Sequence, residues 1–541
     1  MTTIRTAAGI AALLATAVAL SACASAAPGA DAADADADAT PVVGGELVVG
    51  QTDIPPCLDA AITPYNNFAG RAVVDNLFDQ DEETGEILPW LATGYEVSDD
   101  GLTYTISLRD DVTFSNGEPF TADAVTATLD NAIEFRATDG RGVAAAYISG
   151  YSGSEAVDDH TVTVTFEEPK AGFIQALTEK ALGIIWPGSL TLDYDQRCET
   201  GPIGTGPFVI EENVPDDHIT VVRRDGYAWP SPNSDNPGEA YVDAIRFVEI
   251  PEGGVLTESL LSGEVDAAIS LSSTDIARVE GEGGQVVSAV SAGIANTIYP
   301  NLDHAPFDDE AVRQAFQVGF DRQELQDTIY DQYSPAPTSV ISDTVPGHVD
   351  LSDALAYDPD AAAALLEDAG WEIADDGIRE KDGERLEAEI TFTDENSRPL
   401  WQLVQAQLLE IGFDLQLRQV TLAESTALQE SGEWDLLAGN FTRADPDVLL
   451  NTFHPDFVTY ARFTDENIPD LVEVLDAQTT ELDPAARQEL FAEAQRLIVE
   501  RGYGFPYSQS GRPTVALGNV HGLGNQLTGW QVFDEAWLDA E

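Results

Sequence analysis

Basic residues are scarce in this chain of 541 residues. Its 25 lysines and arginines are outnumbered by 96 aspartates and glutamates, which gives a formal net charge of −71. Lysine occurs only as Lys170, Lys180 and Lys381. Because such a charge repels phosphate backbones, the composition argues against nucleic-acid binding. Salt adaptation and a codon bias toward Ala, Asp, Gly and Val explain the acidity equally well.

Apolar runs long enough to cross a bilayer are also missing. The run Ala7–Leu20 has about 14 residues, short of the roughly 20 that a membrane helix needs. It follows the basic residue Arg5 and ends in small residues, a pattern typical of a secretory signal. We therefore expect residues 1–22 to be an export signal.

Cysteine is rare, and one of the three ends the sequence Leu-Ser-Ala-Cys at Cys23. This tetrapeptide resembles the lipobox of bacterial lipoproteins, which implies that Cys23 carries a diacylglycerol thioether. Two acyl chains anchor a protein stably, whereas one anchors it only marginally. Plain secretion remains the alternative, because "SACASA" loosely offers an Ala-x-Ala cleavage site. Residues 23–44, acidic and free of aromatics, are expected to form a disordered tether to the membrane.

The other two cysteines, Cys57 and Cys198, lie in loops rich in Pro and Gly. An even pair outside the cytoplasm makes a disulfide plausible. Two unpaired thiols are the alternative that the sequence leaves open.

Strand and helix patterns alternate after residue 45. Leu102, Tyr104, Ile106 and Leu108 alternate with polar residues, as in a strand with one buried face. In the next segment, Thr121 is a predicted N-cap, and the residues Val125, Leu129 and Ile133 share one helical face. The mixture predicts an α/β fold.

Seven segments in order resemble one known family. They are "YTISLRDDVTFSNGEPFTADAV", "GTGPFVI", "LLSGEVDAA", "APFDDEAVRQAFQVGFDRQEL", "YDPDAAAALLEDAGW", "LLEIGFDLQL" and "ADPD". The chain thus resembles the family 5 extracellular solute-binding proteins, which include dipeptide-, oligopeptide- and nickel-binding components of ABC importers. The resemblance covers nearly all of the chain after the expected tether.

The resemblance implies a bilobal α/β fold of the periplasmic-binding-protein type II, with an extra subdomain in lobe I. Lobe I is expected at 45–290, with the inserted subdomain at about 71–199, and the chain returns to it at 505–541. Lobe II is expected at 291–504. A monomer would then hold its solute between the lobes, close, and be recognised by an ABC permease with its ATPase subunits.

The same resemblance suggests ligand-binding residues. Asp445, in "RADPD", matches an Asp that accepts hydrogen bonds from a peptide's α-ammonium, although an Asp-Pro turn is the alternative. Arg398, in "NSRPLW", matches an Arg that pairs with the ligand's carboxylate, although it could be a surface residue before a helix. Trp401 could lie in the cleft or in the core. Tyr65 and Asn66 occupy a loop that lines the cleft in such proteins.

Signatures of catalysis or metal binding are lacking. The six histidines have no metal-ligand spacing, and no Gly-x-Ser-x-Gly or P-loop motif occurs. We therefore expect a receptor that is not an enzyme and has no cofactor or metal. A short peptide is the favoured solute; a nickel chelate, an opine or an oligosaccharide is the alternative. A cell-wall hydrolase or an adhesion protein on the same tether is the rival class.

Overall fold

The computed structural model describes residues 40–63, 67–139, 144–457 and 462–540. Residues 41–541 form one compact unit. Cys23 and most of the expected tether lie outside the described residues, so the predictions about export and lipidation stay predictions. None of the helices in the described ranges is both long and apolar enough to cross a membrane.

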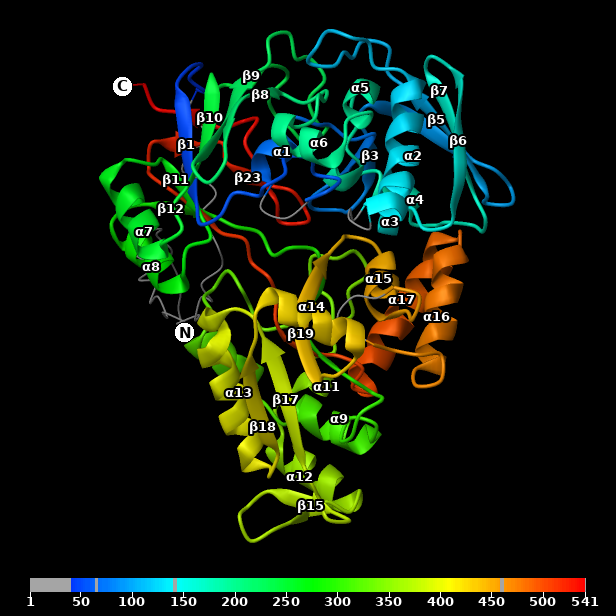
Figure 1. The fold of residues 1–541 in the computed structure, drawn as a ribbon, viewed down its shortest axis with the longest axis vertical. Coiled ribbons are helices and arrows are strands. Elements are labelled where there is room, and N and C mark those ends of the chain that lie inside the picture. Colours follow the sequence, from blue (N-terminus) through cyan, green and yellow to red (C-terminus); the bar gives the residue numbers. More distant parts are fainter. Residues whose placement is uncertain (1–39, 64–66, 140–143, 458–461, 541) are drawn as a thin grey trace, which may run out of the picture. The chain divides into compact units, whose positions relative to one another are not determined.

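The first large sheet has the strand order β12-β21-β11-β1-β10-β9-β8. Strand β1 lies parallel to β10 and β11, and the other pairs are antiparallel. We call the half built on this sheet lobe I (Figure 1). The strand bounds are Glu46–Gln51 (β1), Phe208–Val214 (β8), His218–Arg223 (β9), Ala244–Glu249 (β10), Ala267–Ile269 (β11), Gln285–Val287 (β12) and Thr514–Ala516 (β21).

Lobe I also contains an inserted subdomain with the antiparallel strand order β4-β5-β7-β6. The predicted alternation is found in β5 (Thr103–Leu108), where Tyr104, Ile106 and Leu108 are buried. Helix α2 (Ala122–Asp139) begins directly after Thr121, and it buries Val125 and Leu129 as its spacing predicts. The other strands are Ala92–Val97 (β4), Tyr151–Asp158 (β6) and Thr161–Phe166 (β7).

Short elements complete lobe I. The helices are Phe68–Ala72 (α1), Ala144–Tyr147 (α3), Phe173–Ala176 (α4), Lys180–Leu182 (η1), Pro187–Leu190 (α5), Tyr194–Thr200 (α6), Gly253–Ser262 (α7) and Ser273–Gly281 (α8). The short strands are Phe78–Gln80 (β2), Ile87–Pro89 (β3), Val520–His521 (β22), Gly524–Asn525 (β23), Gln531–Val532 (β24) and Trp537–Leu538 (β25).

The second large sheet has the strand order β18-β17-β19-β13-β20, and the half built on it is lobe II. Strand β17 is parallel to β18 and β19, whereas β13 is antiparallel to β19 and β20. The bounds are Gly293–Pro300 (β13), Glu387–Phe392 (β17), Asp414–Gln419 (β18), Leu436–Thr442 (β19) and Phe505–Ser508 (β20). Because β20 pairs with β13, the chain returns to lobe I only after Ser508, slightly later than the expected residue 505.

Helices cover the lobe II sheet with buried apolar faces. Val312, Phe316 and Phe320 are fully buried, as are Val404 and Leu408 of α13. Each such side chain contributes about 1.5–3 kcal/mol by its burial. The helices are Glu310–Val318 (α9), Arg322–Thr328 (α10), Ser352–Leu355 (α11), Pro359–Asp368 (α12), Glu395–Ser397 (η2), Arg398–Glu410 (α13), Leu422–Ser431 (α14), Asp447–Phe453 (α15), Pro469–Thr480 (α16) and Pro484–Glu500 (α17). A small sheet comprises Glu372–Ile373 (β14), Arg379–Lys381 (β15) and Glu384–Arg385 (β16).

Two segments join the lobes, one after β12 and one after β20. They run side by side, because the Ser291 amide donates to the Ser510 carbonyl over 2.9 Å and Val290 forms a bridge with Gly511. Paired crossovers of this kind suit a hinge between two rigid bodies.

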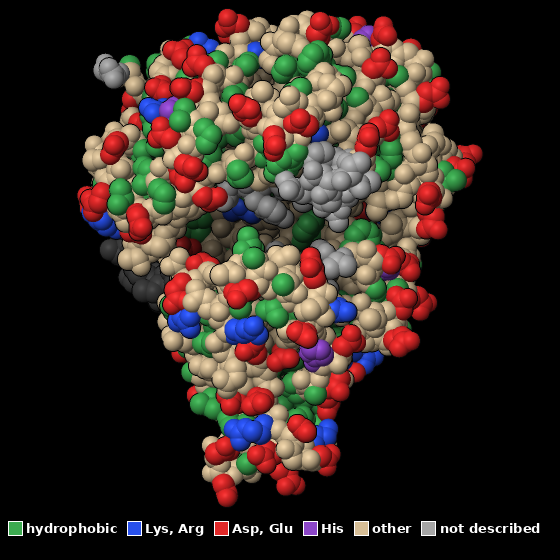
Figure 2. Space-filling model, in the orientation of Figure 1, with side chains coloured by type: hydrophobic (Ala, Val, Ile, Leu, Met, Phe, Trp, Pro, Cys, Tyr) green, Lys and Arg blue, Asp and Glu red, His purple; other side chains and the backbone are tan. Residues whose placement is uncertain are grey.

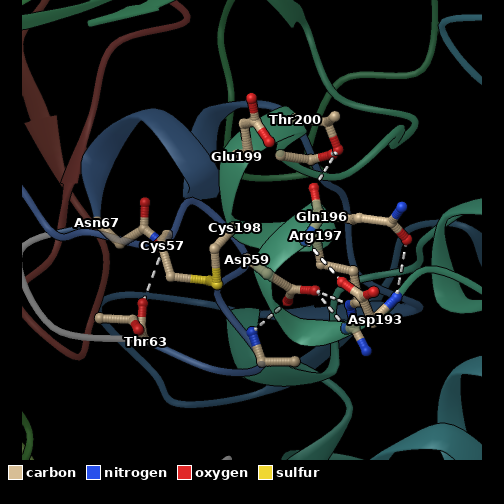
Figure 3. Close-up of a disulfide and its surroundings, with 12 residues drawn as sticks. Cys57, Asp59, Thr63, Asn67, Asp193, Gln196, Arg197, Cys198, Glu199 and Thr200 are labelled. Carbon is tan, nitrogen blue, oxygen red and sulfur yellow. Dashed lines mark hydrogen bonds and ion pairs between the residues drawn. A yellow bond between two sulfur atoms is a disulfide. The ribbon is translucent and has the colours of Figure 1, made fainter. Parts of the chain in front are cut away.

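A disulfide between Cys57 and Cys198 ties the loop before α1 to helix α6 (Figure 3). Beside it, the Arg197 guanidinium forms a buried ion pair with Asp59 and donates to the Asn131 side chain over 2.8 Å. Asn67 caps α1 by accepting from the Gly70 amide, and its own amide donates to the Cys57 carbonyl over 3.2 Å. These contacts fix the position of α1, which carries Arg71.

Candidate binding site at the lobe boundary

Lobe II reaches lobe I through the loop that follows β19. Arg443 is fully buried, and its Nε donates to Gln175 Oε1 over 2.9 Å while its Nη2 donates to the Gly172 carbonyl over 3.2 Å. The Gln80 side chain returns a hydrogen bond to the Ala444 carbonyl. The boundary is therefore closed around this loop by buried polar contacts and not by apolar packing alone.

Asp445 lies in this loop, but its carboxylate already has a cationic partner. Arg487 of α17 pairs with it in bidentate fashion, Nη1 at 3.0 Å and Nη2 at 2.7 Å. Asp445 Oδ1 also accepts the Asp447 amide over 2.9 Å, so the residue forms a turn before α15 as well. Burial alone would lower the pKa of Arg487. The carboxylates of Asp445 and Asp447 nevertheless hold it above its ordinary value.

Asp447 is the most heavily paired carboxylate at the boundary. Lys170 of lobe I lies 3.0 Å from it, Arg487 lies 3.0 Å from it and Arg443 lies 3.5 Å from it. Burial opposes ionisation, but these three cations hold the pKa of Asp447 well below its usual range. Together with Asp445, the cluster contains three cations and two anions.

Glu179, next to η1, is a boundary residue that the sequence reasoning missed. Its side chain is 7% exposed, and Oε1 accepts from Gln175 Nε2 over 3.2 Å. Across the described ranges it forms no ion pair. Burial raises the pKa of Glu179, while Arg443 and Arg71 act in the opposite direction. No motif in "LTEKAL" distinguishes this glutamate from the chain's many other acids.

Arg71 and Arg512 meet at Trp530. Their guanidinium carbons lie 4.8 and 3.8 Å from its ring centroid. Arg71 also donates to Gln526 Oε1 over 2.8 Å, and Arg512 donates to Ser291 Oγ over 3.1 Å. Burial lowers the pKa of Arg71 to about 9; Glu179 raises it and Arg512 lowers it further. Positive charge therefore accumulates beside Glu179.

The other predicted ligand-binding residues have different surroundings. Arg398 begins α13 near the carboxyl ends of β17 and β18, where it pairs with Glu395 over 2.7 Å and donates to Gln419. Trp401 is 2% exposed, donates to Ser397 and packs edge-to-face on Tyr507, so it is a core residue. Tyr65 and Asn66 lie outside the described residues.

Two cavities are lined by residues of both lobes, and Figure 2 shows the surface hollowed between the two halves. The larger, about 750 Å³, is lined by Glu167 and Lys170 of lobe I with His454 and Asp476 of lobe II. The smaller, about 310 Å³, lies between Glu82 and Asp343. The described residues contain no group of three or more His, Cys, Asp or Glu side chains placed to hold a metal ion.

Comparison with known proteins decides the family. The model of the bacterial extracellular solute-binding proteins, family 5 Middle, matches residues 86–458. The chain belongs to this family. It is 27% identical over 476 residues to the nickel-binding periplasmic protein of Escherichia coli (strain K12), covering 85% of this chain and 88% of that protein. It is 26% identical over 459 residues to the glutathione-binding protein GsiB of Escherichia coli (strain K12), covering 81% of this chain and 84% of that protein.

Solved structures show the same fold. NikA from Brucella suis, in complex with Fe(III)-EDTA, superposes with a TM-score of 0.80 at 24% identity, over 92% of this chain and all of that one. DppA from Helicobacter pylori, in complex with the peptide STSA, gives a TM-score of 0.75 at 22% identity, over 92% of this chain and 99% of that one. The predicted bilobal α/β fold is confirmed. By its family, the chain is an extracytoplasmic solute-binding component of an ABC importer.

Proposed function

We propose that this protein is the lipid-anchored receptor of an ABC importer that captures a short peptide at the lobe boundary and delivers it unaltered to the permease. In this proposal the ammonium end of the peptide binds Glu179, with Asp445 beside it as a second acceptor. The carboxylate end binds the pair Arg71 and Arg512. The protein acts by closing on its solute and catalyses no reaction.

The main support for the proposal is that Glu179 is buried and forms no ion pair within the described ranges. A buried carboxylate without an ion-pair partner is costly, and an ammonium taken out of water needs such a partner. A zwitterion satisfies both needs, because its other end meets the two arginines at Trp530. This complementarity favours a peptide over a neutral sugar.

Asp445 has a secondary role in this proposal. Arg487 already spans Asp445 and Asp447, with Nη2 at 2.7 Å from one and 3.0 Å from the other. A small shift toward Asp447 would free part of the Asp445 carboxylate for a ligand's ammonium. Arg398 remains a weaker candidate, since Glu395 occupies its guanidinium.

The names of two relatives agree with a peptide-like solute. One of them is described as glutathione-binding, and a structural neighbour was crystallised with the peptide STSA. Another relative is described as nickel-binding, but among the residues described here none of the acid or histidine groups favours a metal.

Anchoring depends on Cys23 in this proposal. Mass spectrometry of the protein from its native membrane should find a diacylglycerol on Cys23 as the first residue. A mature chain without lipid would contradict the anchor but not the receptor function.

Calorimetry with trialanine, its N-acetylated form and its C-terminal amide tests the proposed solute class. We expect the Glu179→Gln variant to bind trialanine at least tenfold more weakly, about 1.4 kcal/mol. N-acetylation should weaken binding to the wild type by a similar factor and should have little further effect on the variant. Glu118→Gln is the matched control, because this exposed residue precedes α2 and lines none of the cavities described above.

Two results would contradict the proposal. One is equal affinity of the wild type for trialanine and N-acetyl-trialanine. The other is a solute that leaves the protein chemically changed.

A further inference from the structure

Lobe I contains a cavity of its own, of about 250 Å³, whose lining comes entirely from lobe I elements. Its wall includes α1, the segments around β2 and η1, the loop at 227–234 and the C-terminal segment at 522–535. The rings of Phe68, Trp90, Tyr227 and Phe533 form part of the wall. A space of this size suits a group of a few heavy atoms.

Carboxylates outnumber cations in the lining. Asp75 is fully buried, Asp79 is 8% exposed and Glu82 lies at the exposed rim. Asp534 and Glu535 complete the set. The cations in the lining are Lys180 and Arg71: Lys180 donates to the Val74 carbonyl over 2.8 Å and lies 4.7 Å from the Trp90 ring centroid, and Arg71 donates to Gln526. Acidic charge is therefore in excess.

A second observation is independent of charge. Gln531 lines the cavity, is 5% exposed and donates from Nε2 to the Arg512 carbonyl over 2.9 Å, but its Oε1 has no hydrogen-bond partner in the described structure. A buried acceptor without a donor is destabilising, because it has lost its hydrogen bond to water without replacement. Two donors of the cavity wall are already used, since Ser234 donates to Glu535 and Ser231 donates to Asp79. Gln531 Oε1 is thus a buried acceptor in the cavity wall without a donor among the described residues.

We propose that this cavity binds the ammonium or guanidinium group of a small organic cation. Such a group supplies several N–H donors and a positive charge, and the aromatic wall attracts it further. The carboxylates and Gln531 Oε1 would accept its hydrogen bonds.

The titration behaviour of the carboxylates agrees with this assignment. Partial desolvation at the rim raises the pKa of Glu82 to about 7, and the nearby charges of Asp79, Asp81, Glu535 and Asp534 raise it in the same direction. Burial also raises the pKa of Asp75 to about 6. A bound cation would relieve this repulsion.

The cation could be a free amine or a basic side chain of the solute held at the boundary, since Arg71 contributes to both places. Calorimetry distinguishes the two sources. In one arm, 1,4-diaminobutane is titrated at matched ionic strength, with 1,4-butanediol as the neutral control. In the other arm, which rests on the proposed function, Ala-Lys-Ala is compared with trialanine.

Glu82→Gln and Asp79→Asn each remove one charge from the cavity and keep an acceptor atom. We expect each variant to weaken diamine binding by about fivefold, the size of a partly exposed ion pair. Glu86→Gln removes the same charge from the same loop without lining the cavity, so it should leave binding within about twofold of wild type. If the cation is a solute side chain, these variants should instead abolish the preference for Ala-Lys-Ala.

Equal diamine binding in all three variants would show general attraction to an acidic protein and would overturn the proposal. Absence of both diamine binding and any preference for Ala-Lys-Ala would also overturn it. If trialanine itself does not bind, the proposed function fails, and the diamine titration alone then tests whether the cavity binds a cation.

Discussion

Asp447 and Asp75 are both fully buried carboxylates, yet their pKa values move in opposite directions. Asp447 lies among Lys170, Arg443 and Arg487, so its charge is compensated three times. For Asp75, burial outweighs the nearby cations and raises the pKa to about 6. The comparison separates two kinds of buried acid: three cations compensate the charge of Asp447 at the lobe boundary, whereas nearby groups compensate the charge of Asp75 only in part.

The largest expected effect comes from breaking the compensated cluster. Asp447→Asn leaves three buried cations with one carboxylate, which should lower the free energy of unfolding by about 3–5 kcal/mol. Denaturant unfolding measures this loss. Asp368→Asn, at an exposed position on α12, should change it by less than about 0.5 kcal/mol. A loss below about 1 kcal/mol for Asp447→Asn would mean that the network does not hold the boundary.

Removing the disulfide should have the next largest effect. Cys57 and Cys198 are 141 residues apart, so the bond restricts a long loop in the unfolded chain. The double variant Cys57→Ser/Cys198→Ser should lose about 2–5 kcal/mol. Adding a reductant should lower the unfolding midpoint of the wild type and leave the double variant unchanged. A wild type insensitive to reductant would contradict this role.

The pH dependence of folding stability tests the other half of the comparison, the partly compensated carboxylate of Asp75. Because the folded pKa of about 6 lies above the ordinary aspartate value of 3.8, the folded protein holds this proton over that interval while the unfolded chain releases it. Its contribution to stability should therefore decline as the pH rises from about 4 to about 6. Asp75→Asn should remove this decline, and thermal unfolding across the interval would detect it. An unchanged pH profile in the variant would contradict the assignment.

Replacing Glu179 should change the free energy of unfolding least, and in the opposite direction to replacing Asp447. Its charge has no ion-pair partner among the described residues, so Glu179→Gln should leave the free energy of unfolding unchanged or raise it by up to about 1 kcal/mol. Denaturant unfolding of the variant beside Asp447→Asn makes the contrast direct. A loss as large as that of Asp447→Asn would place Glu179 in the structural network.

The sequence could predict the local elements well, because their signals are local. The alternation in β5 and the spacing in α2 both give the observed buried faces. The sequence predicts that the chain returns to lobe I at 505, but β20 still pairs with β13 of lobe II. A strand of this length has no sequence pattern that tells which sheet it joins.

The candidate site was less predictable, because its chemistry depends on contacts between distant residues. Asp445 is placed at the boundary, but its partner Arg487 lies on another helix with no shared motif. The sequence leaves Trp401 open between core and cleft, and its burial and packing against Tyr507 place it in the core. Glu179 is one acid among 96 in sequence and becomes distinctive only through burial beside arginines.

Native mass spectrometry of the protein mixed with trialanine tests the central claim most directly. The proposed receptor should retain one peptide per protein, with the mass of the peptide unchanged after release. A protein that retains no peptide, or that releases fragments of it, would contradict the account.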